Sequence, residues 1–373
     1  MAPLERSATM TDYTIRRFRR GDLEGYLSLY DDVFGRRPDE GWFRWKYRDN
    51  PYADRVPIYV AAANGEIVGA RSFFALPLRT GRTVVRAVQP CDTMVHEAHR
   101  RQGLFTRLTE AAIEDYRDGE PELCFNFPNS KTRAGNRQLG WRVAAERTSY
   151  YRIHDPSAIA AGSGDGVMAL ASSAASPVAR GYLAAWDLVA DGGSAGADVS
   201  VRRHEPVPAA RLASLYRESV PDGFHVPRDE RFLQWRLRRP DWEYRAYLAT
   251  DGDRDRAAMI TGTDRSPGLT RTMILDVLSG VDGSTAVRER LLTAVLADNR
   301  AADLLVASSD SIPRTTLLKR GFLPDDKPPL SPVTETTTLM VRPLSPESDW
   351  TLGGDAIDDG DNWATTYLSH DRN

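Results

Sequence analysis

Between Gln89 and Tyr116, the sequence places side chains suited to binding a pyrophosphate beside side chains suited to proton transfer. A basic turn, His99-Arg100-Arg101-Gln102-Gly103, follows a stretch that predicts a strand, and the apolar spacing after the turn predicts a helix. The start of a helix offers unpaired N–H groups and the positive end of its dipole, and a glycine lets a ligand approach the backbone. The turn therefore favours a pyrophosphate site, with a solvated corner as the alternative.

The same residues resemble the acetyl-coenzyme A loop of the GNAT superfamily of N-acetyltransferases, whose pattern is Gln/Arg-x-x-Gly-x-Gly/Ala. Arg100 and Gly103 match this pattern, whereas Phe105 stands where the family usually has a small residue. The resemblance implies that backbone groups at the strand end pair with the pantetheine arm and that N–H groups of the loop hold the pyrophosphate. The cofactor-binding residues that it implies are Met94, Val95, Arg100, Arg101, Gln102, Gly103, Leu104, Phe105, Thr106 and Asn129.

A second part of the family pattern follows at the expected distance. Asn129 comes just after a predicted strand at 123–127, and it precedes Gly140 of a Gly-Trp pair by the family's usual eleven residues. The resemblance implies that Asn129 reaches the pantetheine arm. The family often has a tyrosine acid four residues before this glycine, and here that position is Asn136.

The groups that could move protons lie around the predicted strand end. The candidate catalytic residues are Asp92, His96, Glu97 and Asn136. His96 has a suitable ordinary pKa, whereas the two carboxylates need burial to raise theirs. Each candidate base has a surface or structural role as its alternative. Tyr150 and Tyr151 could donate the proton that Asn136 cannot, with core packing as the alternative.

Composition limits the class of protein. A chain of 373 residues with 41% hydrophobic and 27% charged residues predicts two or three globular domains. The net charge of −3 gives no indication of nucleic-acid binding. We expect a cytoplasmic protein without a membrane partner, because we find neither a long apolar run nor a signal-peptide core. Cys91 and Cys124 are expected to be buried thiols, and no metal is expected because Cys and His lack ligand spacing.

The pattern of elements predicts a mixed α/β (α+β) fold. The elements predicted before the basic turn are a strand at 13–18, helices at 22–35 and 39–48, a hairpin at 56–78 that turns at Asn64-Gly65, and a strand at 83–95. The helix at 39–48 is crowded with aromatic residues. We expect them to pack on the core or on a second domain, with the acceptor cleft as the alternative.

Later segments echo earlier ones. Trp45 and Gly140 have counterparts in Trp235 and Gly321, which indicates a duplicated domain, with chance similarity as the alternative. The counterpart of the basic loop, 278–284, lacks the Arg-x-x-Gly pattern and carries an aspartate, so we expect no cofactor there. Asp310 and Leu317 stand where the first copy has Asn129 and where the family has its tyrosine.

The chain is therefore predicted to contain two GNAT-like domains, each a central, mostly antiparallel sheet flanked by helices. The predicted parts are a GNAT N-acetyltransferase domain with the acetyl-CoA loop at 12–155, a helical connector and linker at 156–200, a degenerate GNAT-like domain at 201–343 and an acidic tail at 344–373. The composition of the tail predicts a solvated segment, although its tryptophans indicate docking on the body.

The resemblance implies an acetyl-CoA-dependent N-acetyltransferase that acts on an amine of a small molecule, a sugar or a peptide. The paired domains are similar to those of the enhanced-intracellular-survival acetyltransferases, but the tail is too short for their third domain. Two alternatives are a non-catalytic acyl-CoA-binding or scaffold protein and an aminoacyl-transferring relative of the peptidoglycan-bridge enzymes. The sequence leaves open the acceptor, the acid and base, and the oligomeric state.

Overall fold

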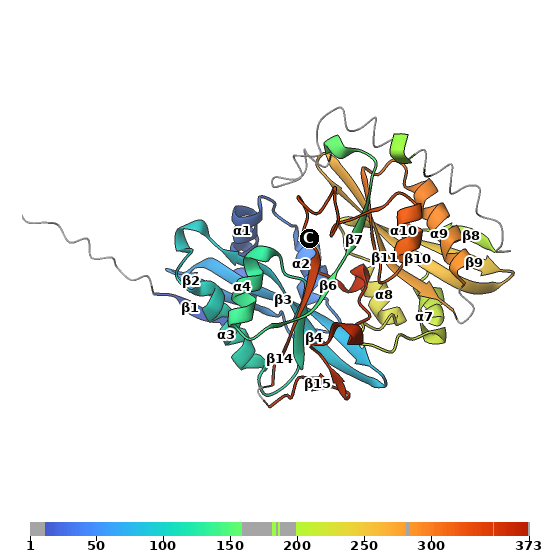
Figure 1. Ribbon diagram of the computed structural model, residues 1–373. Helices are drawn as coiled ribbons and strands as arrows, with labels where there is room; N and C mark the ends of the chain where they lie inside the picture. Colours follow the sequence, from blue (N-terminus) through green and yellow to red (C-terminus); the bar gives the residue numbers. More distant parts are fainter. Residues whose placement is uncertain are drawn as a thin grey trace, which may run out of the picture.

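The computed structural model describes residues 12–158, 181–183, 186, 199–280, 284–345 and 347–371, which form two large sheets flanked by helices (Figure 1). The mixed α/β fold predicted from the sequence is confirmed. The predicted connector and linker at 156–200 lie mostly outside the described residues.

Within the described residues, the first sheet has the strand order β1-β2-β3-β4-β5-β14-β6. Its strands are β1 (Thr14–Arg17), β2 (Ile58–Ala63), β3 (Glu66–Thr80), β4 (Thr83–Val95), β5 (Leu123–Asn126), β6 (Arg142–Arg147) and β14 (Thr337–Pro343). Neighbouring strands are antiparallel except β4 and β5, which are parallel.

The second sheet repeats this plan. Its order within the described residues is β13-β7-β12-β11-β10-β9-β8, and its one parallel pair is β11 with β12. Its strands are β7 (Ser149–Ile153), β8 (Ser200–His204), β9 (Trp242–Asp251), β10 (Arg254–Ser266), β11 (Leu269–Ser279), β12 (Leu304–Ser308) and β13 (Leu323–Pro324). Read from β8, this sheet has the connectivity of the first sheet read from β1, which supports the predicted duplication.

The two sheets exchange one strand each. β14 follows the second sheet in the chain but lies between β5 and β6 of the first sheet, and β7 lies between β12 and β13 of the second. The strand pairing therefore does not divide at the predicted limits of 12–155 and 201–343. The prediction assigned each strand to the domain of its neighbours in sequence, whereas the hydrogen bonds cross between domains.

Helices cover both faces of each sheet. The helices are α1 (Leu23–Phe34), α2 (Glu40–Phe43) with the π-helical turn η2 (Arg44–Arg48), α3 (Leu104–Tyr116), α4 (Ser130–Gln138), α7 (Ala209–Glu218), α8 (Glu230–Arg236), α9 (Thr285–Asp298) and α10 (Arg314–Lys319). Short 3-10 turns are η1 (Arg20–Asp22), η3 (Glu97–His99), η5 (Gly360–Asn362) and η6 (Tyr367–Ser369).

Buried apolar side chains of the described residues form a central core between the sheets and an outer core on each side. Tyr30 of α1 and Phe232 of α8 belong to the central core, which joins the two halves of the chain. Leu108 of α3 and Leu291 of α9 belong to the two outer cores. Because the halves share their largest core, we expect them to fold as one unit.

Local sequence explains several boundaries. The hairpin between β2 and β3 turns at Asn64 and Gly65, whose φ values of 53° and 88° are those that this turn requires, as predicted. Asp39 begins α2 by accepting a hydrogen bond from the N–H of Trp42 at 2.7 Å. The equivalent Asp229 begins α8 in the same way.

A pair of tryptophans joins the two halves at the positions matched in the sequence. The indole Nε1 of Trp45 donates to the carbonyl oxygen of Trp235 at 3.0 Å, and the indole of Trp235 donates to the carbonyl oxygen of Trp45 at 3.0 Å. Their rings stack with centroids 5.9 Å apart. This reciprocal contact is what a duplicated helix pair predicts, and it confirms that Trp45 packs against the second half. The other aromatic residues of 39–48 pack in the core on Tyr26 and Tyr30 of α1.

The carboxy-terminal segment, residues 344–371 with the exception of 346, lies between the two halves (Figure 1). It contains a small hairpin of β15 (Thr351–Leu352) and β16 (Asp355–Ala356). Trp363 is buried between Phe125 and Phe224, one from each half. The prediction of a solvated tail is wrong for this segment, because its apolar residues pack on the central core, as its tryptophans indicated. Asp349, Asp355, Asp359 and Asp361 are exposed, whereas the side chain of Asp371 is buried.

Candidate active site

Strand β4 carries a bulge where the sequence predicts the chemistry. The register with β3 shifts so that Asp92 and Thr93 both lie opposite Arg71. Asp92 has a φ of 39°, which is uncommon for a residue with a side chain. A bulge re-aims the side chains next to it. Here Asp92 contacts the η2 side of the sheet, whereas Thr93 contacts Arg71 on the α3 and α4 side.

Asp92 belongs to a buried ionic cluster. Its carboxylate accepts hydrogen bonds from the Nζ of Lys46 at 2.7 Å and from the hydroxyl of Tyr47. Lys46 is 1% exposed and also bonds the carboxylate of Asp371 at 2.9 Å. Burial lowers the pKa of Lys46, but the carboxylates of Asp371 and Asp92 outweigh burial and raise that pKa above its usual value. The lysine is therefore an ammonium at neutral pH.

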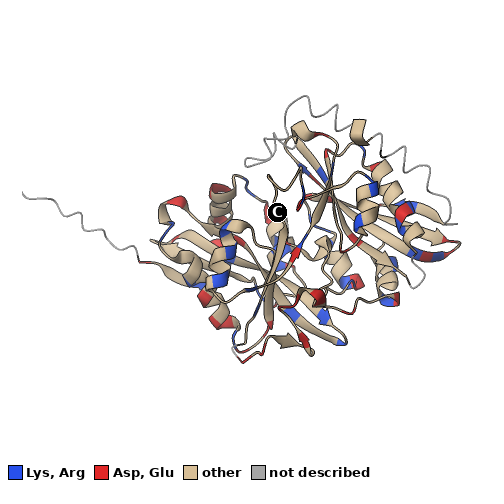
Figure 2. Cartoon of the chain, in the orientation of Figure 1, with Lys and Arg blue, Asp and Glu red and all other residues tan. Residues whose placement is uncertain are grey.

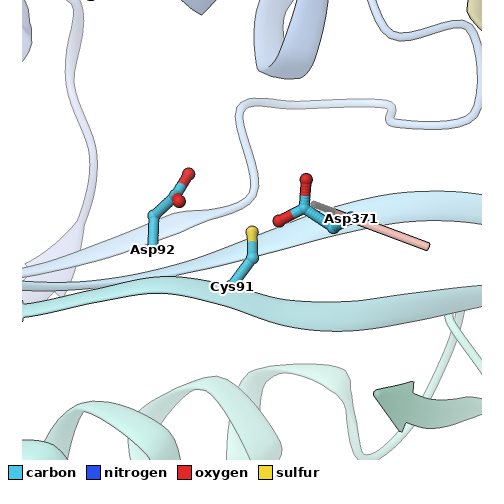
Figure 3. Close-up of side chains that lie close together, drawn as sticks. All are labelled: Cys91, Asp92 and Asp371. Atoms are coloured by element: carbon cyan, nitrogen blue, oxygen red, sulfur yellow. The ribbon is translucent and has the colours of Figure 1, made fainter. Parts of the chain in front are cut away.

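The same cluster contains three groups that could ligate a metal ion. Side-chain atoms of Cys91, Asp92 and Asp371 lie within 4.8 Å of one another (Figure 3). The ammonium of Lys46 already bridges the two carboxylates, so the chain itself supplies the positive charge. The donor set therefore fits the lysine better than a metal ion.

The end of the described chain lies along β4 beside this cluster. The pairing of β4 with β5 is at Ala87 and Val88, and at Gln89 the side chain bonds the backbone of Ser369 and Asp371 instead. His370 stacks on Phe127, just beyond β5, with ring centroids 3.5 Å apart. The carboxy-terminal segment thus forms one wall of the site, a feature that the sequence could not indicate.

The predicted donor loop lies between β4 and α3, as expected. Arg101 and Gly103 have φ values of 62° and 71°, and Gly103 is the residue before the first turn of α3. The first N–H groups of α3 have no side-chain cap, so they remain available to a ligand. Arg100, Arg101 and Gln102 are exposed, and the guanidinium of Arg100 donates to the carbonyl oxygen of Val95 at 3.2 Å. Met94 is fully buried, so it can contribute only its backbone.

The asparagine at the end of β5 differs from the prediction. Asn129 is exposed and caps α4, because its side-chain oxygen accepts from the N–H of Thr132 at 3.1 Å. β5 itself ends at Asn126, which is buried and whose Oδ1 has no hydrogen-bond partner among the described residues. The family pattern has an asparagine at the end of this strand. Asn126 is the last residue of β5, whereas Asn129 lies three residues beyond the strand.

Two buried polar side chains lie together on the α3 and α4 side of the bulge. Arg71 is 2% exposed, bonds the hydroxyl of Thr93 and donates to the Oδ1 of Asn136 at 3.4 Å. Its guanidinium lies over the ring of Phe105, 5.0 Å from the centroid. The structure thus places Asn136 beside the bulge. Arg71 was missed because arginine is abundant throughout this sequence.

The other candidate bases and acids are less well placed. The Nδ1 of His96 accepts from the N–H of Ala98 at 3.3 Å, so a neutral His96 carries its proton on Nε2. Glu97 is exposed in η3. Tyr150 and Tyr151 lie on β7 in the second sheet, where Tyr150 is part of the core under α9. The phenols that the structure brings to Asp92 are those of Tyr47 and, through Tyr47, Tyr26 at 3.3 Å.

The second half has a related but different arrangement. A buried ion pair of Arg228 and Asp276, 2.8 Å apart, lies near the end of β11, as Lys46 and Asp92 lie near the end of β4. Burial raises the pKa of Asp310, and Leu317 is fully buried. Residues 281–283 of the counterpart loop at 278–284 lie outside the described residues.

Residues 14–144 match the model of a family described as the acetyltransferase (GNAT) domain. The chain contains a GNAT domain. The match spans β1 through the first half of β6 and includes the bulge, the donor loop and Asn136. No curated protein matches the sequence.

Solved structures share this fold. A GCN5-related N-acetyltransferase from Anabaena variabilis ATCC 29413 has 11% identity and a TM-score of 0.58, covering 90% of this chain and 73% of the other. A GCN5-related N-acetyltransferase from Kribbella flavida has 16% identity and a TM-score of 0.53, with 89% and 71% covered. At such identities the likeness establishes the fold alone. Because it covers about nine tenths of this chain, the shared fold includes both sheets.

Charged residues of both signs are interspersed over the two halves of the described chain (Figure 2). Among the helices that the structure describes, none combines the length and the apolar character needed to cross a membrane.

Proposed function

We propose that the protein is an acetyl-CoA-dependent N-acetyltransferase that acetylates an amine of a small molecule, a sugar or a peptide. The observation that carries this proposal is the joint presence of the Arg100–Gly103 loop at the start of α3 and a buried carboxylate, Asp92, in the bulge of the preceding strand. The loop supplies donors for a pyrophosphate, and the bulge marks where an extended pantetheine arm would end.

The donor binds through backbone groups in this proposal. N–H groups from Arg101 to Thr106 hold the pyrophosphate, because they are uncapped and the loop around them is basic. The exposed side chains of Arg100, Arg101 and Gln102 add positive charge and hydrogen bonds around it. Asn126 or Asn129 holds the pantetheine arm from the β5 side. The proposed donor is a co-substrate, and the proposal requires no metal.

The acceptor approaches the opposite face of the sheet. Asp92 and Asp371 share the ammonium of Lys46 on this face, and the buried guanidinium groups of Arg236 and Arg239 also act on Asp371. The charges of this face are therefore close to balanced and do not select the charge of the acceptor. Asp92 is the proposed base, because among the predicted bases its carboxylate is the one at the bulge, while the Nδ1 of His96 is engaged by the backbone.

Thiol release from acetyl-CoA with a panel of amino sugars, polyamines, amino acids and peptides tests this proposal. We expect turnover with at least one amine class and its loss in Asp92→Asn, with His96→Gln as the control that retains activity. Asn136 in place of the family's tyrosine favours a second candidate, a non-catalytic acyl-CoA-binding protein. Affinity for acetyl-CoA without thiol release from any amine would establish that second candidate instead.

An aminoacyl-transferring enzyme is less favoured, because an aminoacyl-tRNA donor does not need the basic glycine loop. We propose that neither nucleic acid nor a membrane is a partner. A transfer of an aminoacyl group from charged tRNA without any acetyl-CoA affinity would overturn this assignment.

A further inference from the structure

Arg71 is a buried cation whose described partners include no carboxylate. Its hydrogen bonds go to the hydroxyl of Thr93 and the amide oxygen of Asn136, and its guanidinium lies near the rings of Phe73 and Phe105. Arg228, which is equally buried, has Asp276 as a partner at 2.8 Å. A buried charge is normally paired, so the surroundings of Arg71 suit an anion that the chain does not supply.

Two hydrogen-bond donors at this point have no acceptor. The Nε of Arg71 and the Nδ2 of Asn136 are buried and have no hydrogen-bond partner among the described residues. Asn136 has no exposed surface, and its Oδ1 faces Arg71. Leaving buried donors unpaired is costly. The free-energy cost of these two unpaired donors is offset if a hydrogen-bond acceptor of the substrate binds between Arg71 and Asn136 during the reaction.

The position of this pair suggests which atom it receives. Phe105, under Arg71, belongs to the first turn of α3, directly after the proposed pyrophosphate loop. Thr93, on the other side of Arg71, belongs to the bulge that carries Asp92. Asn136 occupies the sequence position where the resemblance places a tyrosine acid. The pair therefore lies between the two ends of the proposed donor site, where the thioester would react.

We propose that Arg71 and Asn136 bind the sulfur of departing coenzyme A as a thiolate, in place of protonation by a tyrosine. This inference rests on the proposed function. The amine nitrogen bonds to the acyl carbon, the carbon–sulfur bond breaks, and its electron pair stays on sulfur. The proton that the amine loses goes to the base or to water, and the thiolate takes a proton from water after release.

The charged and titratable groups around Arg71 do not change their charge near neutral pH. Cys124 on β5 and Cys91 on β4 are the titratable groups whose charge would act on Arg71, although Cys91 itself contacts Tyr47 on the other face of the sheet. Burial raises the pKa of the Cys124 thiol to about 12 and that of Cys91 well above its usual value, so both stay neutral. Burial lowers the pKa of Arg71 to about 10, which leaves it a cation. Arg342 on β14 lies beyond Cys124, and α3 and α4 contribute the uncharged Phe105 and Asn136.

Binding of coenzyme A and of desulfo-coenzyme A to the full chain, measured by calorimetry from about pH 6 to about pH 9, tests the inference. A thiolate site lowers the pKa of the bound thiol below its free value, which is about 8.5 for a cysteine-like thiol. Affinity for coenzyme A should then rise about tenfold for each unit by which that pKa is lowered. Desulfo-coenzyme A has the same phosphates and no thiol, so its affinity should not show this rise.

Variants assign the effect to the pair. Arg71→Gln should abolish the rise for coenzyme A, Asn136→Ala should reduce it, and Arg342→Gln, a matched half-buried arginine that also faces Cys124, should retain it. Circular dichroism checks that each variant folds. If a variant does not fold, the comparison of coenzyme A with desulfo-coenzyme A on the wild-type chain still tests the inference. Equal pH dependence for both ligands would overturn the thiolate site while leaving donor binding intact. A failure of both ligands to bind would overturn the proposed function itself.

Discussion

Replacing the tryptophans that join the two halves should show whether the chain unfolds as one unit. Trp45 and Trp235 are 7% and 9% exposed, and truncating a buried tryptophan to alanine typically costs about 3–5 kcal/mol of unfolding free energy. Each indole N–H donates to the backbone carbonyl of the other residue, so each single substitution removes one hydrogen bond of about 1 kcal/mol and leaves the other donor in place. Trp45→Ala and Trp235→Ala should each cost about 3–5 kcal/mol.

The double variant isolates the contact between the rings. The stacked pair, with centroids 5.9 Å apart, should contribute a coupling energy of about 0.5–1.5 kcal/mol, so the double variant should cost less than the sum by that amount. Urea unfolding followed by circular dichroism measures all three variants. Trp350→Ala is the control, because Trp350 is only half-buried and its ring contacts Arg142, so it should cost less than either core tryptophan. Effects that add to within about 0.3 kcal/mol, or two separate transitions, would refute the shared core.

Three further predictions concern pH, the donor loop and the acid. Burial lowers the pKa of His225 to about 4 from 6.5, so the stability held by its neutral form is present above pH 6.5 and is lost as pH falls toward 4, by up to about 3 kcal/mol. Urea unfolding against pH should show this loss, and His225→Gln should flatten it. Gly103→Asp should weaken acetyl-CoA binding at least about tenfold, because a φ of 71° strains any side chain by about 1–2 kcal/mol and the new charge repels the pyrophosphate; unchanged affinity, or two equivalent sites per chain in calorimetry, would contradict the single donor site. The pH–rate profile should rise up to about pH 9 without falling, because Arg71 keeps its charge below its pKa of about 10, and Asn136→Ala should raise the barrier by on the order of 1 kcal/mol; a descending limb that vanished in Tyr150→Phe or Tyr151→Phe would show that a tyrosine acid is present.

The sequence predicted the parts of the fold that depend on residues close together in the chain. The Asn64-Gly65 turn and the strand, basic loop and helix around Gly103 were predicted because their signals lie within a few residues. The echo of Trp45 in Trp235 indicated the duplication, since a repeated helix repeats its buried residue. These features needed no knowledge of distant contacts.

Contacts between distant segments could not be predicted in this way. Nothing near β14 indicates that it pairs with β5 and not with the second sheet, because an apolar alternating strand fits either edge. The cluster of Lys46, Asp92 and Asp371 brings together three widely separated residues, so no spacing marks it. Arg71 resembles any other arginine until its burial and its lack of a carboxylate are known.

The exchange of β7 and β14 has a consequence for how the protein is made. The strand that completes the first sheet is synthesised after the whole second half, so the GNAT domain cannot close while the ribosome is still translating that half. Until then, β5 and β6 present open edges to other chains, and open edges promote aggregation. A fragment ending near residue 155 would keep the open edges of β5 and β6. It would also contain β7 without β12 and β13, the strands with which β7 pairs. The second half is thus bound to the first by the order of synthesis as well as by its packing.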